Sequence, residues 1–166
     1  MKTRTAIIAA VGVVIVAAGW YAFRPERLFI DQTVDEKLAY AAPTADSTAA
    51  AKPATLAQGM FHSNAHETKG NATVLKLPDG RRVLRLTSFE TSNGPDVHIY
   101  LVAAADVTDD GIVKTAGFVD LAPMKGNRGD QNYEIPVDVD LAKYRTVTVW
   151  CKRFSVNFGS APLAGA

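Results

Sequence analysis

The chain has 166 residues, 48% of them hydrophobic, and its 18 basic residues are nearly balanced by 17 acidic ones. This length fits one ordinary domain with a single core. The near-neutral charge excludes the basic stripe that a phosphate backbone requires, so we expect no nucleic-acid binding.

An uncharged and mostly apolar run opens the chain at Thr5–Phe23. At about 1.5 Å per helical residue, this run roughly matches a hydrocarbon core of about 30 Å. A cleaved signal peptide is the alternative, because residues 17–19 are small. We favour a retained anchor, since the apolar run continues through Trp20 and Tyr21, which suit a membrane interface. The sequence therefore predicts one transmembrane helix, and the membrane is the first expected partner.

The basic groups on the two sides of this run are nearly balanced and do not decide its orientation. We adopt the ordinary outcome for a single leading anchor, which places the amino terminus in the cytoplasm. Residues 1–27 are then a signal-anchor in the cell membrane, and the remainder is extracytoplasmic. Residues 28–58 are expected to form a juxtamembrane segment and linker. Within that region residues 39–58, rich in Ala, Thr, Ser and Pro, predict a flexible tether.

Residues 59–166 show a hydrophobic period of two, with turn residues at short intervals. This pattern predicts an all-β domain, an antiparallel β-sandwich or barrel of about seven to eight short strands without an interrupting helix. Pro78, Asp79 and Gly80 indicate a hairpin turn between the first two strands. The expected strands are 72–77, 82–87, 97–103, 112–121, 132–135, 145–152 and 154–158.

Five segments of this domain carry a family signature: GMFHSNAHETKGNATVL (59–75), LRLTSFET (84–91), NGPDVHIYL (93–101), KGNRGDQNYEIP (125–136) and VWCKRFSVNFGSAPL (149–163). Together they resemble the DM-thirteen domain, which is described as an electron-transfer domain and occurs in Skeletor-type proteins and beside DOMON domains. The resemblance covers essentially the whole folded part. It implies a small extracytoplasmic β-domain whose hallmark is one cysteine near its carboxyl end, here Cys151, for which a redox role has been proposed.

Cys151 is the only cysteine of the chain. Exported proteins usually pair their thiols, so an unpaired one needs a reason. In a strand, Arg153 would share a face with Cys151 and favour a reactive thiolate. Val147 and Val149 share that face too, which favours an inert buried thiol. Both interpretations stay open. A reactive Cys151 would need its partner from elsewhere, because no second cysteine can resolve a disulfide within the chain.

A metal or haem bound through Cys151 is a further option. His62, His66 and His98 are the only histidines, and one thiolate with two imidazoles is the equatorial set of a blue-copper site. The chain lacks the usual His or Met just after the cysteine. His62 and His98 are therefore weak metal candidates, and surface, loop or hydrogen-bonded histidines are the simpler interpretation. The cofactor stays unknown.

Residues 126–130 predict a tight glycine-rich loop, with Arg128 and Asp130 able to bind a sugar, an anion or a cation. Five aromatic residues, Tyr133, Tyr144, Trp150, Phe154 and Phe158, are expected in the core. No nucleophile, base and orienting acid stand together, so we expect no stand-alone enzyme. Two functions remain: a membrane-anchored extracytoplasmic redox module centred on Cys151 with an unidentified redox or envelope partner, or a non-catalytic ligand- or protein-binding domain with a structural cysteine.

Overall fold

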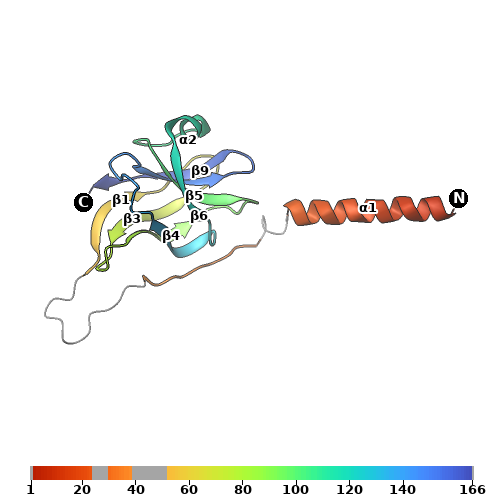
Figure 1. The fold of residues 1–166 in the computed structure, drawn as a ribbon, viewed down its shortest axis with the longest axis horizontal. Coiled ribbons are helices and arrows are strands. Elements are labelled where there is room, and N and C mark those ends of the chain that lie inside the picture. Colours follow the sequence, from red (N-terminus) through yellow and green to blue (C-terminus); the bar gives the residue numbers. More distant parts are fainter. Residues whose placement is uncertain (1, 24–29, 39–51, 166) are drawn as a thin grey trace.

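The structure, a computed structural model, describes residues 2–23, 30–38 and 52–165. Helix α1 spans Lys2–Phe23 and stands apart from the β-body (Figure 1). The helix predicted at Thr5–Phe23 is therefore present. Within the described ranges, however, we find no helix whose length and apolar character suffice for crossing a membrane. The transmembrane role of α1 stays a prediction.

The β-body consists of two antiparallel five-stranded sheets that pack face to face and do not close into a barrel. Sheet A has the order β10-β1-β3-β4-β7: Ala164–Gly165, Ala54–Met60, Lys69–Lys76, Arg82–Glu90 and Arg128–Ile135. Sheet B has the order β2-β9-β8-β5-β6: His62–Ser63, Val156–Pro162, Thr146–Cys151, Val97–Val102 and Phe118–Pro123. The predicted sandwich is confirmed and the predicted alternative of a barrel is wrong.

Alternating apolar residues build the interface between the sheets. Each strand points every second side chain inward, so one face of sheet A meets one face of sheet B. The inward residues include Val74, Leu84, Ile99, Leu101 and Val149, all 0% exposed. Each such side chain contributes about 1.5–3 kcal/mol by leaving water. The predicted hairpin is also present. The amide of Leu77 donates to the carbonyl of Arg81 at 2.8 Å, around a turn in which Gly80 has φ +89°.

The predicted strand 112–121 is wrong in its first half, where the chain forms helix α2, Asp110–Ala116. Asp109 caps this helix, since its Oδ1 accepts hydrogen bonds from the amides of Gly111 and Ile112. Val113 is buried with Tyr100, Val102, Val107 and Trp150 on the outer face of sheet B. Central strands β5 and β8 are consequently buried on both faces.

Two predicted boundaries and one predicted core residue also change. Residues 54–58, expected in the tether, form most of β1, whereas the rest of that predicted linker at 39–51 lies outside the described residues. Strand β7 begins at Arg128 rather than at 132, so the expected loop at 126–130 is partly strand. Phe154, expected in the core, lies in a turn before β9 and is 60% exposed.

Residues 30–38, which we call the strap, run along β7 at the edge of sheet A. A parallel bridge joins Thr33 to Arg128. The amide of Val34 donates to the carbonyl of Arg128 at 2.9 Å, and the amide of Glu36 donates to that of Asp130 at 2.8 Å. Part of the predicted juxtamembrane segment is therefore an extended piece of the folded body.

Candidate functional site

Cys151 is the last residue of β8 and pairs with Val97 of β5 and Val156 of β9. Its side chain is 0% exposed and belongs to the apolar cluster between the sheets, together with Val147 and Val149. The strand alternation predicted this shared core face, and the structure confirms it. A thiol must be accessible to its reaction partner in order to react. Because its side chain is fully buried, Cys151 is enclosed in this conformation.

The chain turns directly after Cys151, over residues 152–155. Lys152, Arg153 and Phe154 are exposed there, and Ser155 has φ +55°, a conformation that non-glycine residues rarely adopt. Arg153 therefore lies in a turn and not in a strand, so strand geometry gives it no shared face with Cys151.

The three histidines lie at separate places. His62 on β2 bonds through Nε2 to Asp106 Oδ1 at 2.8 Å. The ring of His66 packs on Phe158, with centroids 3.9 Å apart. His98 lies on β5, and strands β9 and β8 stand between β2 and β5 in sheet B. The structure thus does not bring the two metal candidates, His62 and His98, together.

His98 forms a charged cluster on the outer face of sheet B, a feature that the sequence pattern did not predict. Its Nδ1 lies 2.8 Å from Asp120 Oδ1, and its Nε2 lies 3.2 Å from Asp96 Oδ1. Lys152 Nζ reaches the other oxygen of Asp120 at 3.3 Å. His98 is opposite Trp150 in the ladder, whereas Cys151 is opposite Val97, so His98 and Cys151 point to opposite faces.

No metal centre fits these residues. Among the described residues, no group of three or more His, Cys, Asp or Glu side chains has the arrangement to hold a metal ion. Cys151 lies in the hydrophobic cluster between the sheets, on the opposite face of sheet B from His98. Within the part of the chain that the structure describes, a metal held by this thiol together with histidines or carboxylates is therefore not assembled in this conformation.

Aromatic rings surround the outer side of β8. The ring of Tyr100 stacks on that of Phe118 with centroids 4.4 Å apart, and the centroid of the Trp150 ring lies 6.3 Å from that of Tyr100. Burial raises the pKa of Tyr100 to about 12, with the charges of Asp120 and Asp96 adding to the effect. Tyr100 is therefore a neutral phenol at physiological pH. Trp150 and Phe158, both predicted core aromatics, are buried as expected.

A cavity of about 330 Å³ lies where the strap meets the body. His98 and Asp96 contribute polar groups to its wall, Met124 contributes apolar surface, and Ile30 and Gln32 of the strap close one side. The cavity has the size of a small-ligand site. It was not predictable from the sequence, because its walls come from segments far apart along the chain.

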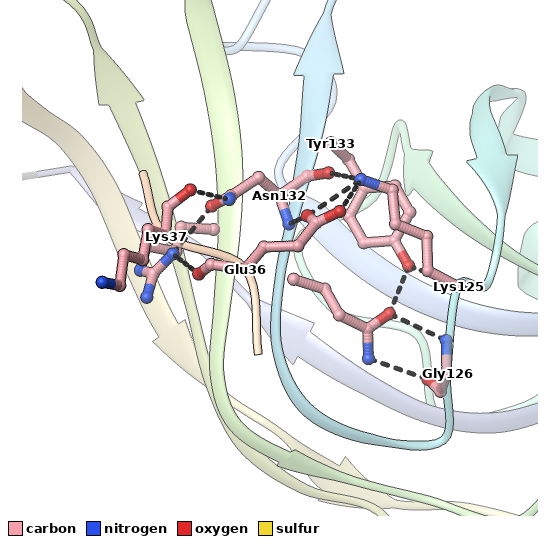
Figure 2. A network of polar contacts seen from close by, with 8 residues as sticks. Glu36, Lys37, Lys125, Gly126, Asn132 and Tyr133 are labelled. Carbon is pink, nitrogen blue, oxygen red and sulfur yellow. Dashed lines mark hydrogen bonds and ion pairs between the residues drawn. The ribbon is translucent and has the colours of Figure 1, made fainter. Parts of the chain in front are cut away.

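A polar network fixes the strap beside this cavity (Figure 2). Glu36 accepts hydrogen bonds from Lys125 Nζ at 2.8 and 2.9 Å and from the amide of Asn132 at 2.8 Å. Behind them the Tyr133 hydroxyl donates to Oε1 of the fully buried Gln131 at 2.6 Å. Gln131 Nε2 in turn donates to the carbonyl of Gly126 at 2.8 Å. Burial is the main reason that the pKa of Tyr133 is raised. The glycine-rich loop therefore receives the chain's own strap.

A sequence model of the family described as Electron transfer DM13 matches residues 60–163, more than half of the chain. No curated protein and no solved structure matches the chain. The matched region contains Cys151 and strands β2 to β9, and it leaves the strap, β10 and all of β1 except Met60 outside.

Proposed function

Because the chain belongs to the DM13 family of electron-transfer domains, we propose that it is a redox module in which Cys151 is the reacting group. The observation that carries the proposal is the position of the chain's only cysteine, at the end of β8 inside the matched region. With a single thiol, the module works together with a second protein.

The chemistry that suits one thiol is exchange with a partner disulfide. The Cys151 thiolate attacks one sulfur of the partner, the partner's S–S bond breaks, and the partner's second sulfur leaves as a thiolate. A mixed disulfide results, and the electron pair of the Cys151–partner bond replaces that of the broken bond. The partner disulfide is the oxidant, and attack by the partner's own second thiolate on the mixed disulfide reverses the step.

Access to Cys151 requires movement at the end of β8. The thiol is 0% exposed, and the three residues that follow it along the chain, Lys152, Arg153 and Phe154, are exposed. Ser155 holds a positive φ in that turn, which costs backbone energy that a displaced turn would recover. We place the opening at this turn, since it moves fewer residues than separation of the two sheets.

We also propose that the module is tethered to the cell membrane by α1 and lies on the extracytoplasmic side. The uncharged run Thr5–Phe23 supports this assignment, together with the usual orientation of a single leading anchor. The partner is then an envelope protein that carries a reactive disulfide.

The test is glutathionylation of the folded full-length chain. Incubation with glutathione disulfide should add one glutathione per chain by mass spectrometry, and dithiothreitol should remove it. The Cys151→Ser variant should add none. A wild-type chain that adds glutathione only in denaturant would contradict the proposal.

A second function is favoured by the complete burial of Cys151 and by the cavity at His98. In this alternative the body binds a ligand or an envelope protein, and the cysteine is structural. The two functions differ in one result, because binding by such a domain would survive a Cys151→Ser substitution that leaves the fold intact.

A further inference from the structure

The strap and the β7 edge match each other residue by residue. Beyond the backbone bonds to β7, Arg128 Nη2 lies 3.1 Å from Asp31, and Asn127 donates to the same carboxylate at 2.8 Å. At the other end Lys125 and the Asn132 amide bind the carboxylate of Glu36. The edge therefore recognises an extended segment with two acidic side chains.

The edge is also shaped to accept a backbone. A Cβ atom at Gly126 would overlap the carbonyl oxygen of Gln32, and one at Gly129 would overlap that of Val34. Asn127 is 2% exposed, and its side chain accepts from the amide of Gln32 at 2.7 Å and donates to Thr91 at 3.1 Å. Such an edge binds a peptide by adding a strand.

The family model matches β7 but not the strap. The β7 edge is therefore part of the family domain, whereas the strap that occupies it is an addition to that domain. Residues 39–53 connect the strap to β1. At about 3.3 Å per residue they reach roughly 50 Å when extended, enough to place the strap on a neighbouring molecule. Exchange of an identical element between two copies re-forms every contact and is a low-cost route to dimers.

We propose that the β7 edge takes the strap of a second copy of this chain, giving a strand-exchanged dimer. The strap in cis competes at an effective concentration on the order of mM, so exchange is expected where the local concentration of chains is high. This inference goes beyond the redox function and does not depend on Cys151.

A charge exchange at the Glu36–Lys125 pair tests the proposal in full-length chains in detergent solution. Within one chain, Glu36→Lys places two positive charges together, at positions 36 and 125, and Lys125→Glu places two negative charges together there. In a mixture, each strap meets a complementary edge only on the other chain. Light scattering should show a dimer fraction in the mixture that exceeds that of either variant alone by about tenfold.

The double variant Glu36→Lys/Lys125→Glu is the matched control, because it restores the pair within one chain; it should be folded and show no larger dimer fraction than the wild-type chain at the same concentration. Two results would overturn the proposal. The first is a mixture whose dimer fraction is no larger than that of its two components, while the control is folded. The second is a dimer fraction in either variant alone that equals the dimer fraction of the mixture, because association would then not use the strap.

Discussion

Cys151 fills a core position whose neighbours are apolar on the inner face of both sheets. The Cys151→Ser variant places a hydroxyl in this hydrophobic cluster. We expect it to lower the free energy of unfolding by about 1–3 kcal/mol, measured by urea denaturation followed by tryptophan fluorescence. Val137→Ser, at a residue that is 86% exposed, is the control and should change stability by less than about 0.5 kcal/mol. Equal stabilities would show that the thiol is not a core group.

Gly126 allows the strap to approach the body, because a methyl group there would overlap the carbonyl of Gln32 and lie against Val34. We expect Gly126→Ala to speed hydrogen exchange in residues 30–38 by about tenfold or more, measured by mass spectrometry of that peptide. Gly165→Ala, where a Cβ has open space, should leave exchange unchanged. Unchanged exchange in Gly126→Ala would mean that the strap does not rest on this loop.

Residue-level predictions succeeded where the period of two sufficed. The alternation of Val147, Val149 and Cys151 favoured a core position for the thiol, which the structure shows. The same alternation wrongly placed Arg153 in the strand with Cys151, because no local signal shows that β8 ends at Cys151. Asp120 was missed as a partner of His98, since their contact depends on the register between β5 and β6.

At the scale of elements, the docking of the strap depends on an ionised carboxylate. Burial raises the pKa of Glu36, but the hydrogen bonds from Lys125 and from the Asn132 amide, with the charges of Lys125 and Arg85, hold it below its ordinary value of 4.5. A depressed pKa in the folded state means that this stabilisation is present above that value and is lost as the pH falls through the folded pKa.

This coupling can be followed at the Asn132 amide, which donates to Glu36 at 2.8 Å. We expect its NMR chemical shift to titrate with a midpoint below the ordinary value of 4.5. Glu36→Gln should abolish that titration. A midpoint at or above the ordinary value would contradict the ion pair with Lys125.

Helix α2 depends on a single cap. The Asp109 carboxylate accepts from two amides of the first turn, at 2.7 and 3.2 Å. Asp109→Ala should therefore lower the free energy of unfolding by about 1 kcal/mol in urea denaturation. Asp109→Asn, which keeps a capping oxygen, should recover most of that loss. A null effect of Asp109→Ala would mean that packing of Val113 alone holds the helix.

The elements that the sequence did not predict share a cause. Residues 112–116 alternate well enough to resemble a strand, and their helix is decided by the Asp109 cap and by the outer face of sheet B. The strap has few apolar residues, and its conformation comes from hydrogen bonds to β7, which lies far along the chain. Local patterns do not contain such tertiary contacts.

At the scale of the whole molecule, the sequence predicted the all-β body because both sheets are half-buried or buried and their strands alternate. It did not distinguish a sandwich from a barrel, since that depends on whether the edge strands pair. Here β7 and β10 end sheet A while β2 and β6 end sheet B, so the sheets stay open. The strap then covers one of these edges.

The redox proposal requires a thiol that is buried in the folded body and reached by a local opening at residues 152–155. Its most direct test is the rate of alkylation of Cys151 in the full-length chain across low urea concentrations, compared with the rate of global unfolding. The account predicts alkylation faster than global unfolding and nearly independent of urea, because a local opening exposes little surface. Alkylation that follows the rate and urea dependence of global unfolding would contradict it and make Cys151 a structural core residue.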